Sequence, residues 1–252
     1  MRIKILVILL LTSFVGFAST PKDDTHENFR FGLEEFNQVL SYNTKNSTLL
    51  SSNEVLGKHF TQLEKKQSKY KKETQFVEHV FYYIHKKLLK NYEQYASINQ
   101  TLATGAYDCV TATAVYALFL TELDIPYAVI ETNYHIYVLV FPDTEKEILL
   151  ETTDPLNGFI DNPAEIVKRK QLYAKSNLEV DENQVDLAWD VENNLKNTEL
   201  IGVLLYNQSI KQYNLGNQTE AISLAIDALS YYSSARIKTY LGFISSNQTA
   251  FK

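Results

Sequence analysis

The spacing of hydrophobic residues predicts helices in the first part of the chain. Leu33, Phe36 and Leu40 are spaced to share one face of a helix. The Ser-, Thr- and Asn-rich stretch at 41–53 predicts a loop, and residues 53–64 predict a second helix.

A longer amphipathic helix is predicted at 71–95, where a hydrophobic stripe lies opposite several lysines. The polar stretch at 99–107 then leads into a helix that begins at Cys109. This helix is apolar or small on nearly every face, which indicates that it is buried. We expect it to end before Pro126, because proline disfavours helical backbone at the residue that precedes it.

Three runs rich in β-branched and aromatic residues follow, namely YAVIET, YHIYVLVF and EILLETT. The turn sequence PDTEKE at 142–147 separates the last two, so we expect three short and mainly antiparallel strands. Residues 162–174 suit a helix, with Pro163 in its first turn. The pattern predicts an α+β fold in which helices pack on a small antiparallel sheet and an α-helical hairpin region follows.

The predicted organisation has a signal peptide at 1–18, a helical region at 19–70, a core at 71–175, a linker at 176–197 and a helical segment at 198–252. The linker is predicted because this stretch is polar and acidic.

The C-terminal segment contains YNQSIKQYNLGNQTEAISLAIDALSYYSSA, which resembles a single tetratricopeptide unit. Gly216 is expected in the turn between paired helices, with Ala221 and Ala228 at their close contacts. The resemblance implies a helical hairpin that docks on the core or binds a partner protein.

The first residues have the pattern of a secretory signal peptide. Arg2 and Lys4 precede an apolar run at 5–15, and small residues at 16–18 suit cleavage. We therefore expect an exported protein, periplasmic or extracellular, without a membrane span after cleavage.

Composition excludes several other classes of function. The formal net charge of -6 gives no basic footprint for nucleic acid. His79 and His85 are six residues apart on different faces of one helix, so they do not form a metal-ligating pair. The sequence has no phosphate loop or dinucleotide fingerprint, and we predict neither a metal nor another cofactor.

Cys109 is the only cysteine in the 252 residues, so it cannot form an internal disulfide. Its place at the start of a helix favours the thiolate and predicts a lowered pKa. His135 lies in the second predicted strand, and Asp154 lies at the end of the third. Neighbouring strands can bring a carboxylate beside a histidine, which would favour a Cys–His ion pair.

Together, GAYDCVTATAVYALFLTELDIPYAVI, YHIYVLVF and LLETTDP resemble the core of the transglutaminase-like superfamily, which is related in architecture to papain-type cysteine proteases. The resemblance covers about residues 75–160. ETNYH and DPLNGF are more similar still to a subgroup of exported bacterial proteins. The resemblance implies that Cys109 is the nucleophile, His135 the base and Asp154 the acid that orients the histidine.

The chain departs from the family pattern at two positions near these residues. Tyr107 stands two residues before the cysteine, where glycine is common, and Tyr137 stands two residues after the histidine, where tryptophan is common. The only tryptophan, Trp189, lies outside the matched region. The backbone amide of Cys109 is the first expected oxyanion donor. The second donor is left open among three residues, Asn99, Gln100 and Tyr107.

The sequence thus favours a thiol enzyme that acts on peptide or protein amides, by hydrolysis rather than transamidation. One alternative is a noncatalytic transglutaminase-like scaffold of the cell envelope, whose C-terminal helices contact a partner protein. Another is an envelope protein joined through an intermolecular disulfide at Cys109.

Overall fold

The computed structural model describes residues 46–133, 135–175 and 192–246, and their side chains from residue 54 onward. The predicted signal peptide at 1–18, the helix predicted around Leu33 to Leu40, and Trp189 lie outside these residues.

A five-stranded antiparallel sheet lies at the centre of the α+β fold. Its strands are ordered β6-β5-β4-β3-β7. Their bounds are β3 Tyr127–Thr132, β4 Ile136–Val140, β5 Ile148–Leu150, β6 Phe159–Ile160 and β7 Glu192–Leu195. The three predicted strands correspond to β3, β4 and β5. β7 lies within the predicted linker, so the end of that segment belongs to the sheet, where Leu195 pairs with Val129.

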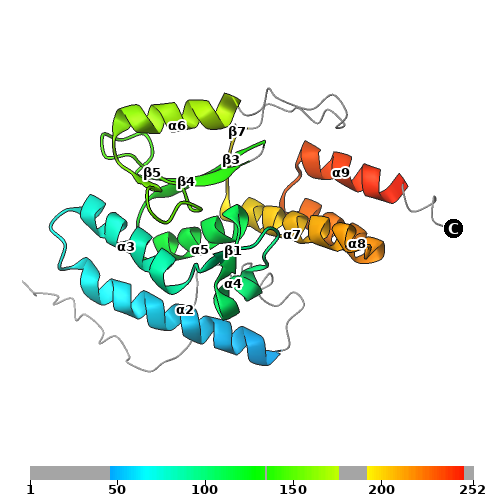
Figure 1. Ribbon diagram of the computed structural model, residues 1–252, viewed down its shortest axis with the longest axis horizontal. Coiled ribbons are helices and arrows are strands. Elements are labelled where there is room, and N and C mark those ends of the chain that lie inside the picture. The colour runs from blue at the N-terminus through cyan, green and yellow to red at the C-terminus, as the bar shows by residue number, and fades with distance from the viewer. Residues whose placement is uncertain (1–45, 134, 176–191, 247–252) are drawn as a thin grey trace, which may run out of the picture.

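Two helices cover opposite faces of this sheet, as Figure 1 shows. α5 (Cys109–Glu122) lies on one face and α6 (Pro163–Lys175) on the other. Strand alternation divides the apolar side chains between them. Ile136, Val138 and Val140 join the core that contains α5, whereas Tyr137 and Leu139 pack in a smaller cluster with Ile166 and Tyr173 of α6.

α5 is buried on nearly every side, as the sequence predicts. Eleven of its residues, from Val110 to Leu120, are buried. Tyr116, at the centre of the helix, donates a hydrogen bond at 2.9 Å to the carbonyl of Phe81 in α3 (Glu73–Lys87). This contact satisfies a buried hydroxyl and fixes α3 against α5.

The helices that precede α5 differ in extent from the prediction. α2 is longer and α3 shorter than expected, and the polar stretch before Cys109 contains a helix and a short strand. Their bounds are α2 Asn46–Gln67, α3 Glu73–Lys87, β1 Asn91–Tyr92, α4 Ile98–Thr104 and β2 Ala106–Tyr107. α4 forms because Ser97 and Gln100 build a capping box, and it ends at Gly105 with φ +84°.

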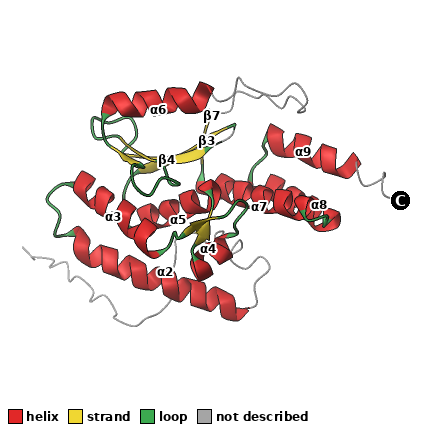
Figure 2. Ribbon diagram, viewed as in Figure 1, coloured by secondary structure: helices red, strands yellow, loops and turns green. Residues whose placement is uncertain are grey.

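Three helices form the C-terminal part of the described chain, namely α7 Asn197–Asn214, α8 Gln218–Tyr231 and α9 Ala235–Ser246. Gly216 lies between α7 and α8 with φ +80°, as expected for the turn. Ala221 and Ala228 are fully buried. At Gly202 a Cβ atom would lie 2.5 Å from Cβ of Tyr232, so this glycine lets α7 approach the end of α8 closely. Figure 2 shows the helical character of this part.

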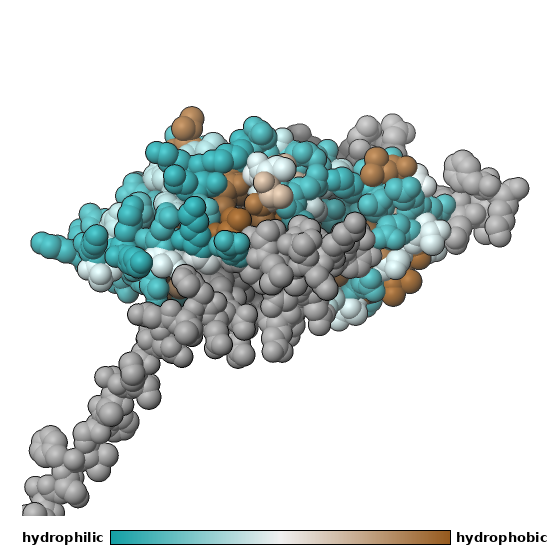
Figure 3. Space-filling model, turned by 90° about the horizontal axis from the view of Figure 1, so that it is seen from below, coloured by the Kyte–Doolittle hydropathy of each residue, from teal (hydrophilic) through white to brown (hydrophobic). Residues whose placement is uncertain are grey.

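Hydrophobic side chains are also found on the surface. Figure 3 shows a face on which hydrophilic residues prevail and hydrophobic ones gather in small groups. The most exposed large hydrophobic residues are Leu156 (77%) and Leu215 (64%). In the part of the chain that the structure describes, no helix is both long and apolar enough to cross a bilayer.

Candidate thiol site

The topology brings Cys109, His135 and residue 151 to the same end of the sheet. The fourteen residues of α5 span about 20 Å, and the six residues of β3 return over about the same length. The start of α5 therefore lies near the end of β3. β4 is antiparallel to β3 and begins there, and the next strand, β5, ends there.

Cys109 is the first residue of α5, and Asp108 is the N-cap of that helix. The Asp108 carboxylate accepts a hydrogen bond at 2.9 Å from the amide of Thr111, whose hydroxyl accepts one at 2.9 Å from the amide of Asp108. This capping box satisfies amides at the positive end of the helix and places a buried carboxylate beside the thiol. An aspartate directly before the helix is a visible N-cap signal in the sequence that our prediction of the site did not use.

The thiol environment favours the neutral form. Burial raises the pKa of Cys109 to about 12, and the carboxylates of Asp108 and Glu151 add to this effect. The amides of Val110 and Cys109 act in the opposite direction, with a smaller effect. The expected lowering of the pKa is therefore wrong for this state, because the N-cap carboxylate and burial outweigh the helix dipole.

His135 is paired with Glu151. Its Nε2 lies 2.6 Å from Oε2 of Glu151, and the two side chains are 20% and 7% exposed. His135 comes directly before β4, and Glu151 directly follows β5. The last register pair of these strands is Val138–Leu150, so His135 and Glu151 both lie just beyond the paired residues at this end of the sheet.

Glu151 receives further hydrogen bonds that keep it ionised. The hydroxyl of Thr153 donates at 2.6 Å to Oε1, and the hydroxyl of Tyr173 in α6 donates to Oε2 at 2.5 Å. Burial alone would raise the pKa of Glu151, but the hydrogen bond from His135, its positive charge and the two hydroxyls lower the pKa to about 2. Glu151 is therefore a buried carboxylate at neutral pH.

The structure does not bring Asp154 to His135. Oδ1 of Asp154 accepts hydrogen bonds from the amides of Leu156 at 3.1 Å and Asn157 at 2.9 Å, which stabilises the turn after β5. The carboxylate that contacts His135 is three residues earlier. Side chains alternate between the two faces along β5, so residue 151 points to the α6 face, where His135 lies. Asp154 comes three residues later and belongs to the turn.

Cys109 and His135 lie on different sides of the sheet. The imidazole packs with Tyr173 of α6, with ring centroids 4.7 Å apart, whereas Cys109 packs against the core on the α5 side. Among the described residues no hydrogen bond joins the thiol to His135. Glu151 interacts with both groups. It contacts His135 directly, and its negative charge raises the pKa of Cys109.

The candidate oxyanion donors have varied environments. Gln100 is engaged in the cap of α4, where its Oε1 accepts from the amide of Ser97 at 3.0 Å and from Nζ of Lys211 at 3.0 Å. Asn99 lies in the same helix. Tyr107 is buried, and its ring centroid is 6.1 Å from that of Tyr92. Burial and the charge of Asp154 raise the pKa of Tyr107.

His85 is a buried histidine of the α5 side that the sequence does not single out. It is 6% exposed among aromatic rings, those of Phe81, Tyr107 and Tyr116. Neither ring nitrogen has a hydrogen-bond partner among the residues described. Burial lowers the pKa of His85 to about 4, against the charges of Asp154 and Glu151, so the imidazole is neutral at neutral pH.

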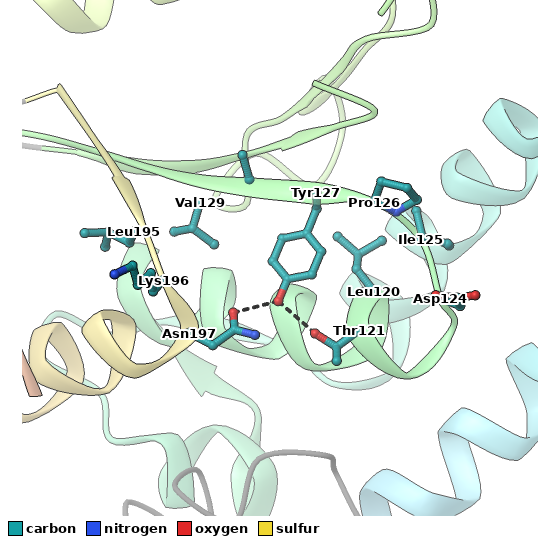
Figure 4. A pocket seen from close by; sticks show the side chains of 11 residues that line it. Leu120, Thr121, Asp124, Ile125, Pro126, Tyr127, Val129, Leu195, Lys196 and Asn197 are labelled. Atoms are coloured by element: carbon teal, nitrogen blue, oxygen red, sulfur yellow. Dashed lines mark hydrogen bonds between the residues drawn. The ribbon is translucent and has the colours of Figure 1, made fainter. Parts of the chain in front are cut away.

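A pocket of about 450 Å³ lies at the opposite end of α5, between β3 and the start of α7 (Figure 4). Tyr127 points into the gap and donates a hydrogen bond at 2.7 Å to Asn197. Leu120 of its wall is eleven residues, or about 17 Å of helix, from Cys109. This pocket therefore does not serve the thiol.

Within residues 46–133, 135–175 and 192–246, no group of three or more His, Cys, Asp or Glu side chains could hold a metal ion. No family model, curated protein or solved structure matches this chain.

Proposed function

We propose that this protein is an exported thiol-dependent acyl-transfer enzyme with a transglutaminase-like core, and that Glu151 takes the role expected for Asp154. The observation that carries the proposal is the Glu151 carboxylate. It accepts a hydrogen bond from His135 at 2.6 Å, as the acid that orients a catalytic base would. A nucleophile, a base and an orienting acid thus share one end of the sheet.

In the proposed reaction, Sγ of Cys109 attacks the carbonyl carbon of a peptide or protein amide. Because the resting thiol is neutral, its proton leaves during the attack and passes to Nδ1 of the neutral form of His135, whose Nε2–H donates to Glu151. His135 then gives this proton to the leaving nitrogen as the C–N bond breaks. Water, the favoured acceptor, or a second amine loses its proton to His135 and cleaves the thioester, which restores the thiol.

The backbone amide of Cys109 supports this chemistry as a donor to the developing oxyanion. His135 must turn from the α6 side toward the thiol to take part. The backbone of His135 is hydrogen-bonded to Thr132, so this motion is a rotation of the imidazole side chain alone. The C-terminal helices α7 to α9 are the proposed contact for a protein partner.

The test measures acylation of Cys109 by p-nitrophenyl acetate, followed by intact mass on the mature chain. We expect His135→Ala and Glu151→Gln each to slow acylation by about 100-fold or more, as general-base catalysis predicts. Comparison of Glu151→Gln with Asp154→Asn decides which carboxylate supports the base. Cys109→Ser is the blank.

A noncatalytic scaffold is the second candidate, favoured by the thiol pKa of about 12 and by the separation of Cys109 from His135. In that case His135→Ala would be acylated at the wild-type rate, and Cys109→Ser would capture the same partner proteins as the wild type.

A further inference from the structure

Helix α7 reaches the residue that precedes the thiol. Nδ2 of Asn207 donates a hydrogen bond at 2.6 Å to Oδ2 of Asp108. The two residues are 8% and 3% exposed, so water does not compete with this contact. Thr111 already occupies the other carboxylate oxygen. Asn207 therefore completes the partners of the N-cap.

This contact has an electrostatic consequence for Cys109. Burial raises the pKa of Asp108, whereas the hydrogen bonds from Thr111 and Asn207 lower it and favour the charged carboxylate. That charge disfavours the neighbouring thiolate. Asn207 thus influences the thiol through Asp108, although it lies 98 positions from Cys109 in the sequence.

Helix α9 reaches the turn that carries His135. The guanidinium of Arg236 donates to Oε1 of Glu131 at the end of β3, and its Nη1 donates at 3.1 Å to the carbonyl of Asn133 in the turn. Tyr232 donates to the other oxygen of Glu131 at 2.8 Å. Glu131 is 2% exposed, so the C-terminal helices provide its buried counter-charge.

We infer that Asn207 and Arg236 are positioning residues of the thiol site, so that the C-terminal helices set the state of Cys109 and the place of His135. This inference rests on the proposed function. Other contacts dock the same helices without reaching the site: Nε2 of Gln208 donates to the carbonyls of Tyr95 and Ala96 at 3.2 and 3.0 Å. Gln208→Ala is therefore a matched control for Asn207→Ala.

The first experiment measures the rate of Cys109 alkylation by iodoacetamide from pH 5 to 10. Without Asn207, the charged form of Asp108 loses a hydrogen-bond donor, so the pKa of Asp108 rises further and the carboxyl, once neutral, no longer opposes the thiolate. Below the raised pKa of Asp108, Asn207→Ala should be alkylated about five- to tenfold faster than the wild type. At pH 10 the two rates should be the same. Gln208→Ala should retain the wild-type profile.

A double-mutant cycle distinguishes the loss of the Asn207–Asp108 contact from a general loosening of the fold. Asp108→Asn removes the charge, so adding Asn207→Ala to it should change the alkylation profile no further. The free energy of unfolding of each variant, measured in urea, gives the share of alkylation that takes place in unfolded molecules. Additive effects, or a profile shared by Asn207→Ala and Gln208→Ala, would show that α7 only docks and would overturn the inference for Asn207.

The second experiment tests Arg236 with Arg236→Lys, since lysine keeps the charge but cannot span both acceptors. The Hε1 NMR signal of His135, assigned with His135→Gln, should move, while the signals of His59 and His79 stay in place. Lys211→Ala, which removes a contact of α7 with α4, is the control. A His135 signal that does not move would overturn the inference for Arg236.

Both experiments give a readout whether or not the protein catalyses acyl transfer. If His135→Ala is acylated normally, the proposed function fails, yet the coupling of Asn207 to the thiol is still measured by alkylation. If the enzyme is active but the mutant cycle is additive, only the positioning role fails.

Discussion

On the α6 face of the sheet, the buried carboxylate of Glu151 accepts hydrogen bonds from His135, Thr153 and Tyr173. On the α5 side, the imidazole of His85 is buried without a partner for either nitrogen among the described residues, and the thiol of Cys109 is held neutral. The carboxylate on one face is thus charged and hydrogen-bonded, whereas the imidazole and the thiol on the other are neutral. For Glu151 the hydrogen bonds and the charge of His135 outweigh burial, whereas for His85 and Cys109 burial prevails.

The largest effect is expected from breaking the network of the α6 face with Glu151→Gln. The neutral amide loses the charge-assisted hydrogen bonds from His135, Thr153 and Tyr173, and we expect the free energy of unfolding at pH 7 to fall by about 3 kcal/mol in urea titrations. Glu147→Gln removes a more exposed pair with Lys170 of α6 and should cost below about 1 kcal/mol. Equal losses in the two variants would contradict the importance of the buried network.

The same carboxylate predicts an acid dependence. The pKa of Glu151 falls from 4.5 in its ordinary state to about 2 in the fold. Its contribution to stability is therefore complete above about pH 4.5 and is lost as the pH falls toward 2. The difference in stability between the wild type and Glu151→Gln should shrink over this interval.

A smaller effect of opposite sign is expected on the α5 side. His85→Phe removes two unsatisfied polar atoms from an aromatic setting and should stabilise the fold by about 1 to 2 kcal/mol at neutral pH. His79→Phe in the same helix is the control, because His79 is more exposed and lies 3.4 Å from Lys66. A stability loss in His85→Phe would mean that the imidazole has a bonded role.

His85 also gives a pH dependence with a defined sign. Its pKa falls from 6.5 to about 4 on folding, so the unfolded chain takes up a proton first. Stability should decrease as the pH falls from 6.5 to 4, by about 2 kcal/mol. This dependence should be absent in His85→Phe, as thermal unfolding at several pH values would reveal.

The smallest effect concerns the contact between α5 and the segment after β5. Thr113 and Thr152 are fully buried, and their hydroxyls are 3.1 Å apart. Thr113→Val leaves one hydroxyl without its partner and should cost about 1 kcal/mol. Replacing both threonines by valine should restore most of this loss in chemical denaturation, and a larger loss in the double variant would contradict the pairwise account.

Much of the fold follows from local pattern. The uniform apolar character of residues 110–120 indicates a buried helix, and the alternation around His135 predicts β4. β7 could not be predicted, because ENNL has little hydrophobic pattern and gains its strand form by pairing with β3. The capping box of α4 at Ser97 and Gln100 was equally hidden in a polar stretch.

For the candidate site, the residue types were predictable but their partners were not. Glu151 and Asp154 are both carboxylates near the end of a strand, and only the folded chain shows that Glu151 reaches His135 while Asp154 accepts from the amides of its own turn. The protonation of Cys109 depends on burial and on the charges of Asp108 and Glu151, and Glu151 lies 42 positions away in the sequence. Long-range contacts of this kind leave no periodic signal.

The pairing of β7 with β3 has a consequence for the integrity of the sheet. Four register pairs, from Val129–Leu195 to Thr132–Glu192, cover the backbone of β3 on the side away from β4. A chain that ended at residue 191 would expose this row of amides and carbonyls as an open edge, ready to pair with another molecule. With β7 in place the edge of the described sheet is a strand of four residues, ENNL, whose short and polar character makes it a poorer template for edge-to-edge pairing than β3.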